Sequence, residues 1–223
     1  MRRSEVLLGT LLVAIIAVIG VTALLLWFRP ALSSIGVVSA LPTSAPIVAE
    51  GSIVQERNTP GYTAQMGYAV AQSRATAWRA DAVLLSTSAT WPPGSSLGEI
   101  LSGQVAWGFT FYAPDANLVS IVSVANQAAT LSNQQEAYGM LTPLPVENWR
   151  IDSDDVIQAL FNGGGNEFLR QEGAATLTIT LTYNPTAQRV EWFVSLIAQR
   201  TGHSLTMLVN AADGAVLEVE QIP

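Results

Sequence analysis

The chain has 223 residues, a formal net charge of −7 and no cysteine, which excludes disulfides, thiolate nucleophiles and cysteine-based zinc or iron–sulfur sites. Residues 30–223 hold 16 acidic residues against seven arginines, a net charge of −9. A surface of this sign repels the phosphates of nucleic acid, so we exclude nucleic acid as a partner.

An uncharged apolar segment near the N-terminus predicts a transmembrane helix. It runs from Val6 to Phe28, 23 residues, and at about 1.5 Å per residue it would span ~34 Å, enough to cross ~30 Å of hydrocarbon. Arg2 and Arg3 precede it, so we expect a cytoplasmic N-terminus and an extracytoplasmic C-terminal domain. The side chains expected to contact the lipid bilayer are Val6, Leu7, Leu8, Leu11, Leu12, Ile15, Ile16, Ile19, Leu24, Leu25, Leu26, Trp27 and Phe28.

A cleaved signal peptide is the alternative interpretation of this segment. Signal peptides have an apolar core of roughly 7–15 residues with a small-residue cleavage site close behind it. The candidate cleavage site here, Val38-Ser39-Ala40, lies well beyond the end of a longer core. We therefore expect an uncleaved single-pass anchor over residues 1–29. The prolines of residues 30–61 then favour an extended stalk.

Residues 62–132 predict a first α+β unit. Its helix is expected from Ala64 to Arg79, with Met66, Val70, Ala77 and Trp78 on the apolar face. Proline-rich turn signals then separate β-like runs. The expected strands are Ala82–Thr87, Gln104–Tyr112 and Leu118–Val124.

A linker at residues 133–151 leads to a second unit at 152–223. Its helix is expected to start at Asp152, to bury Val156, Ile157, Leu160 and Phe161, and to break at the glycines 163–165. The expected strands are Thr176–Tyr183, Arg189–Ile197, Ser204–Val209 and Val216–Val219.

The two units share their order of elements and one local match. Val105-Ala106-Trp107 aligns with Val190-Glu191-Trp192, each opening a middle strand. Another strand and a turn follow in both: residues 125–128 in the first unit and 210–214 in the second. We predict a divergent tandem repeat of about 85 residues. Whether the repeats form one sheet or two stays open at this point.

The second unit resembles the PepSY family. The resemblance rests on the helix opening DSDDVIQAL, the strand opening VEW and the ending NAADGAVLEVE, and it covers roughly residues 152–220. Asn210 stands where the family usually has Asp, and the three glycines interrupt the helix. The resemblance implies a cystatin-like helix packed on an antiparallel sheet. It also implies a non-catalytic extracytoplasmic role, linked in the family to peptidase inhibition or to regulation of neighbouring proteins.

Residues capable of chemistry are few, and most have a structural interpretation. Asp152, Asp154 and Asp155 lack the glycine and distal glutamate of a calcium loop and are expected to cap a helix. His203, the one histidine, is expected in a surface turn without a metal or catalytic partner. Glycines 163–165 predict a flexible loop, because no lysine accompanies them as in a phosphate loop. We expect no metal, no cofactor and no catalytic residue.

Tryptophans divide into expected core residues and one candidate contact. Trp78, Trp107, Trp149 and Trp192 fall where a helix or strand turns inward. Trp91 precedes Pro92-Pro93-Gly94 and is expected in a loop, where an aromatic side chain could anchor a partner.

The sequence therefore predicts a non-enzymatic, membrane-anchored extracytoplasmic module that binds or regulates a protein partner, such as a peptidase or a membrane complex. One alternative is a structural accessory subunit of a larger membrane complex, held mainly by its transmembrane helix. A further alternative is a hydrolase with dispersed carboxylates.

Overall fold

The computed structural model describes residues 62–103, 105–132 and 134–223. All of the described residues belong to one compact unit. The expected anchor at residues 6–28 and stalk at 30–61 lie outside the described residues. Within the described ranges, no helix has both the length and the apolar character needed to cross a membrane.

The first half of the described chain is a helix followed by an antiparallel meander. Helix α2 begins after Thr63, whose hydroxyl accepts a hydrogen bond from the backbone N–H of Met66. The elements of this half are α2 (Ala64–Trp78), β1 (Val83–Trp91), α3 (Leu97–Leu101), β2 (Trp107–Ala113), β3 (Leu118–Ala125), β4 (Ala128–Leu131) and β5 (Gln135–Glu136), with a 3-10 turn at Pro114–Ala116.

The second half repeats this order with a longer helical segment. A 3-10 turn at Val146–Asn148 precedes it. The elements are α4 (Ser153–Leu160), a π turn (Phe161–Gly165), α5 (Asn166–Glu172), β6 (Ala175–Asn184), β7 (Arg189–Ala198), β8 (Ser204–Asn210) and β9 (Val216–Ile222).

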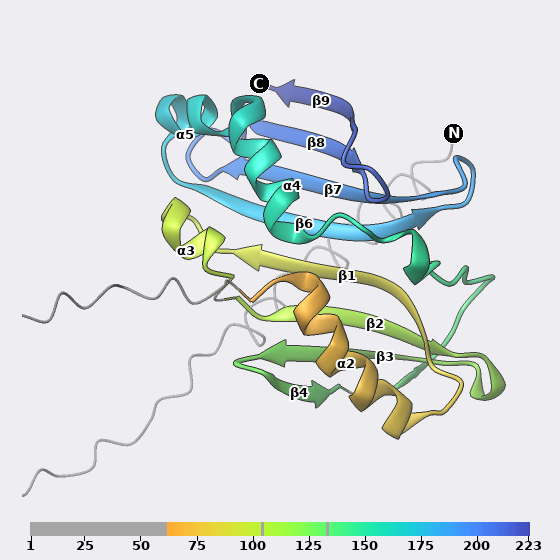
Figure 1. The fold of residues 1–223 in the computed structure, drawn as a ribbon. Helices are drawn as coiled ribbons and strands as arrows, with labels where there is room; N and C mark the ends of the chain where they lie inside the picture. The colour runs from red at the N-terminus through yellow and green to blue at the C-terminus, as the bar shows by residue number, and fades with distance from the viewer. Residues whose placement is uncertain (1–61, 104, 133) are drawn as a thin grey trace, which may run out of the picture. The chain divides into compact units, whose positions relative to one another are not determined.

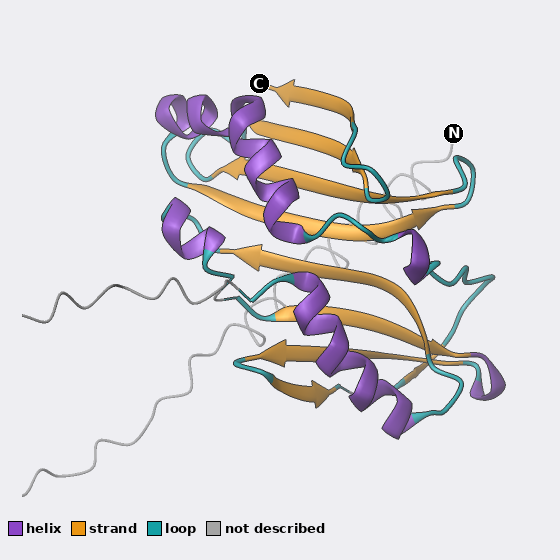
Figure 2. Cartoon of the chain, viewed as in Figure 1, coloured by secondary structure: helices purple, strands orange, loops and turns teal. Residues whose placement is uncertain are grey.

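All of these strands join one antiparallel sheet. Its order is β4-β3-β2-β1-β6-β7-β8-β9, with β5 beside β3. The halves meet where β1 pairs with β6, from Ser86 opposite Thr182 to Trp91 opposite Leu177 (Figure 1). The sequence did not decide whether the two units form one sheet or two. In the structure they share one continuous sheet. Helices α2 and α4 lie on the same face of it (Figure 2).

The core fills the space between those helices and the sheet. Trp107, Phe109, Ile179 and Trp192 rise from the strands and are at most 1% exposed. The predicted inward face of α4 is confirmed, because Val156, Ile157, Leu160 and Phe161 are all buried. Its hydrophobic period of 3.6 residues is a local property of the sequence, which is why the pattern alone identified it.

The predicted inward face of α2 is correct only in part: Val70 and Trp78 pack against the core and are partly buried, whereas Met66 and Ala77 are not. The buried residues of α2 are small: Ala64, Gly67, Ala71 and Ala75. Met66 is 45% exposed, and Ala77 is also exposed. The reason is the space already filled by aromatic strand residues, since a Cβ added at Gly67 would lie only 3.0 Å from the Phe109 ring. Small side chains let this helix approach the sheet closely.

The predicted break at glycines 163–165 is replaced by a kink. The chain leaves α4 through the π turn, where Gly164 has φ 125°, and continues as α5. A Cβ at Gly163 would lie 2.6 Å from the terminal methyl carbon of Met207 on β8. The glycines therefore permit a close passage over the sheet as well as the sharp change of direction.

Strand predictions are correct in position and differ at their ends. β1 runs to Trp91, beyond the expected end at Thr87, and β2 starts at Trp107. The expected turn at residues 125–128 connects β3 to β4, with Asn126 and Gln127 both at positive φ. The sequence patterns did not predict α3, β4 or β5, which are short elements with weak periodicity.

Candidate binding surface

The N-terminus of α2 lies beside that of α4 and is capped by residues from the start of α4. The backbone N–H of Ala64 donates to the Ser153 hydroxyl at 3.0 Å, and that of Gln65 donates to the Asp152 carboxylate at 3.1 Å. Asp152 also accepts the Ser153 N–H at 2.7 Å as the N-cap of α4. The expected capping role of Asp152 is confirmed, and it extends to a helix of the other half.

Asp154 and Asp155 occupy the first turn of α4. Carboxylates are favoured there by the helix dipole. Burial raises the pKa of Asp155, and the nearby charges of Asp154 and Asp152 raise it further. Among the residues the structure describes, no group of three or more His, Asp or Glu side chains is arranged to hold a metal ion.

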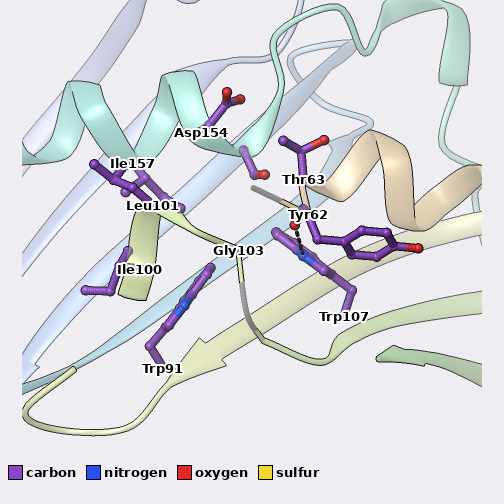
Figure 3. Close-up of a pocket in the computed structure, with 10 residues that line it drawn as sticks. Tyr62, Thr63, Trp91, Ile100, Leu101, Gly103, Trp107, Asp154 and Ile157 are labelled. Carbon is purple, nitrogen blue, oxygen red and sulfur yellow. Dashed lines mark hydrogen bonds between the residues drawn. The ribbon is translucent and has the colours of Figure 1, made fainter. Parts of the chain in front are cut away.

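A small cleft lies beside these helix starts. Trp91 and Trp107 stand at one side of it, with Ile100, Ile157 and Asp154 around its rim (Figure 3). The cavity volume is about 10 Å³, enough for one water molecule. The cleft cannot hold an organic substrate in this conformation.

Trp91 is not the loop residue that the sequence predicted. It ends β1, is 2% exposed, and meets Trp107 edge to face with ring centroids 6.1 Å apart. The segment after it folds back as α3 and places the buried Ile100 in the same cleft. A side chain buried to this extent has almost no surface to offer a partner in this conformation.

The other four tryptophans among the described residues lie as predicted. Trp107, Trp149 and Trp192 are at most 5% exposed, and Trp78 is partly buried against the same core. The indole N–H of Trp107 donates to the Tyr62 carbonyl at 3.2 Å. The indoles of Trp149 and Trp192 both donate to the Ile151 carbonyl, at 3.1 and 2.9 Å. The bonds of Trp107 and Trp192 connect strands β2 and β7 to the starts of α2 and α4.

His203 lies beside the β7–β8 turn, as predicted, but it has a partner that the sequence did not indicate. Its Nδ1 is 2.9 Å from the Glu172 carboxylate, and the Thr201 hydroxyl donates to the same carboxylate at 2.7 Å. These hydrogen bonds, that of Thr201 first, lower the pKa of Glu172. The contact fastens the end of α5 to the turn.

The face of the sheet opposite the helices forms the largest candidate surface. Side chains alternate between the faces of a strand, so residues between the buried core positions of β1, β2, β3, β6, β7 and β8 define this open face. Its hydroxyl residues are Ser86, Ser88, Thr90, Thr110, Ser123, Thr176, Thr178, Thr180, Thr182, Ser195, Ser204 and Thr206. Its larger apolar and aromatic residues are Val83, Tyr112, Val119, Ile121, Phe193, Ile197 and Leu208.

The open face, as defined on these six strands, is almost free of charge. On those six strands its ionisable acids and bases are Arg189 and Glu191, which bind each other, and Asn184 donates to Glu191 at 3.1 Å. Phe193 and Ile197 are 44% and 46% exposed. Contact with another neutral surface would therefore remove apolar area from water without stripping water from an unpaired charge. Protein interface cores are depleted of charge in the same way.

The sequence interpretation did not identify this surface. The available signal was the alternation from Thr176 to Thr182, together with the scarcity of charge in strands on both sides of it. Tyr138 and Met140, 84% and 96% exposed in the loop after β5, were not noticed either.

Comparisons with known proteins identify no family. No family model matches the chain, and no curated protein matches it. Among solved structures it resembles a candidate lipoprotein from Clostridium difficile 630, with 11% sequence identity and a TM-score of 0.42 over 70% of this chain and 92% of that one. This degree of similarity assigns neither a family nor a function.

Proposed function

We propose that this chain is a non-enzymatic, membrane-anchored extracytoplasmic module that binds a protein partner through the open face of its sheet. The observation that carries the proposal is the neutral surface centred on Phe193 and Ile197. The uncharged segment from Val6 to Phe28 supports attachment to a membrane. The sequence resemblance of residues 152–220 to the PepSY family supports a regulatory role toward a peptidase or a membrane complex.

Phe193 is the best single probe of this surface. It pairs with Thr180 on β6 and with Leu208 on β8, so it stands among neighbours of the same open face. Met66 is its matched control, because it is 45% exposed against 44% and lies on α2, on the opposite side of the sheet. A photocrosslinking amino acid at each position in the full-length protein compares the two faces directly in cells.

We expect one discrete crosslinked product from position 193 and none from position 66. Replacing Phe193 and Ile197 by arginine should abolish recovery of that partner, because two charges would enter a dry contact. Equal crosslinking at both positions would reject the open face as the binding surface. Replacing the 6–28 segment by an unrelated anchor separates this proposal from the accessory-subunit alternative. The proposal expects the partner to be retained, whereas the alternative expects the complex to be lost.

Membrane topology has its own test. Protease added outside intact cells should remove the domain that begins at Tyr62, while the N-terminal tip stays protected. Protection of the whole chain would reject the extracytoplasmic placement.

A further inference from the structure

We propose that β9 is a docking edge for an extended segment of the protein partner in which basic and apolar side chains alternate. The inference rests on the proposed function and names the chemistry of the partner. Pairing would add a strand to the sheet next to β9.

The edge at β9 is long and accessible. All seven residues from Val216 to Ile222 are exposed, and β9 has β8 as its one neighbouring strand in the described part of the chain. The opposite edge strand, β4, has four residues. In an antiparallel strand with one neighbour, every second residue turns its backbone N–H and C=O outward. β9 therefore offers a row of main-chain donors and acceptors to an added strand.

The two faces of β9 differ in character. Glu218 and Glu220 pair with Leu208 and Thr206, so both carboxylates border the open face, on the same side of the sheet. Val219 pairs with the buried Met207 and belongs to the helix face, yet it is 47% exposed. An added strand would meet two negative charges on one side and the uncharged Val219 and Gln221 on the other.

The negative charges of β9 disfavour pairing of this edge with β9 of a second copy of the chain. In a symmetric antiparallel pair centred on Val219, Glu218 of each copy would stand opposite Glu220 of the other. Like charges directly opposite each other destabilise a strand pair. The net charge of the chain, −7, opposes self-association further and attracts basic segments.

A strand with Arg or Lys at positions i and i+2 and apolar residues between them would complement both sides of β9. Its basic side chains would lie opposite Glu218 and Glu220, and the apolar side chains between them would contact the side of Val219. Main-chain hydrogen bonds would supply affinity for any extended chain, and the alternation would supply specificity.

The test uses the full-length protein in detergent micelles at physiological salt. The probe is a fluorescent synthetic peptide as long as β9 with arginine and valine in alternation. A scrambled peptide of the same composition and an N-methylated copy, which cannot donate from its backbone, serve as controls. Fluorescence anisotropy measures binding, and hydrogen exchange reports the protection of β9 amides.

We expect the alternating peptide to bind roughly ten-fold more tightly than either control and to slow exchange in β9. Glu218→Arg with Glu220→Arg should reverse the preference toward a glutamate–valine peptide. The matched variant Glu136→Arg with Glu147→Arg changes the net charge equally at exposed positions elsewhere and should leave the preference unchanged. Equal binding of the scrambled or N-methylated peptide would overturn the inference.

The two proposals can fail separately. If the peptide does not bind while crosslinks at Phe193 persist, the docking edge is wrong and the open face stands. If the peptide binds and no crosslink forms at Phe193, the proposed use of the open face is wrong.

Discussion

Trp107 and Trp192 make the same contact in the two halves of the sheet. Each indole N–H donates to the backbone carbonyl two residues before the start of a helix: Tyr62 before α2 and Ile151 before α4. The two rings then meet at an angle of 67° with centroids 6.5 Å apart. The two hydrogen bonds therefore position each helix on its strands. The contact between the two rings joins the halves through aromatic packing.

Replacing Trp107, Trp192 or Trp91 by phenylalanine should lower the unfolding free energy by different amounts. The loss depends on whether the removal of the indole N–H leaves a backbone carbonyl without a donor. Trp107→Phe leaves the Tyr62 carbonyl without its indole donor, a loss of about 1–3 kcal/mol of unfolding free energy beyond the smaller ring. Trp192→Phe should cost less, because Trp149 still donates to Ile151. Trp91→Phe should cost least, because its buried N–H has no partner among the described residues. Chemical denaturation of the three variants measures the order, and equal losses would contradict it.

Gly103 should tolerate no side chain. Its φ is +64°, and a Cβ there would lie 2.4 Å from the Tyr62 carbonyl oxygen and 2.5 Å from its nitrogen. Backbone atoms cannot move aside as a flexible side chain can, so we expect Gly103→Ala to cost more than about 2 kcal/mol. Gly98→Ala in α3 is the control, since the nearest atom is 4.0 Å away. It should be neutral or stabilising by up to about 1 kcal/mol. Similar melting temperatures for the two variants would refute the contact.

Gln127 should gain stability on replacement by glycine. It follows Asn126 in the two-residue loop between β3 and β4. The φ angle is 49° at Asn126 and 62° at Gln127. Two-residue hairpin loops with both φ positive favour Asn-Gly. We expect Gln127→Gly to raise the unfolding free energy by about 0.5–1 kcal/mol. A lower melting temperature in calorimetry would show that the hairpin has another conformation in solution.

The stability of the fold should decrease at low pH because Glu172 becomes protonated. Its pKa in the folded chain lies below the ordinary 4.5, because Thr201 and His203 hydrogen-bond the carboxylate. The ionised carboxylate thus stabilises the fold above pH ~4.5, and this contribution is lost as the pH falls through the lower folded-state value. The melting temperature of the wild type should exceed that of Glu172→Gln at pH 7, and the difference should shrink in acid.

Thr201→Val tests the cause of that shift. Because the Thr201 hydroxyl makes the largest contribution, its removal should raise the pKa of Glu172. Carboxyl-carbon NMR measures the value directly. An unchanged pKa would mean that the hydrogen bond is not formed in solution.

Local signals in the sequence determined several elements of this fold. The inward face of α4, with Val156 and Leu160, follows from its 3.6-residue period. Asp152 was identified as a cap because short carboxylates satisfy free amides at a helix start. The uncharged segment at residues 6–28 predicts an anchor from its length and apolarity alone. Each of these features depends on residues that are neighbours along the chain.

Tertiary structure decided the rest. The Pro-Pro-Gly signal marks a turn after Trp91, but α3 folding back over the cleft is what buries that ring. Small residues face inward on α2 because Phe109, from a strand far along the chain, already fills the space. The pairing of β1 with β6 merges the halves, and no helix of the described residues covers the other face of the sheet. Period and turn chemistry act between neighbours, whereas the choice of buried face depends on the volume of side chains that meet only after folding.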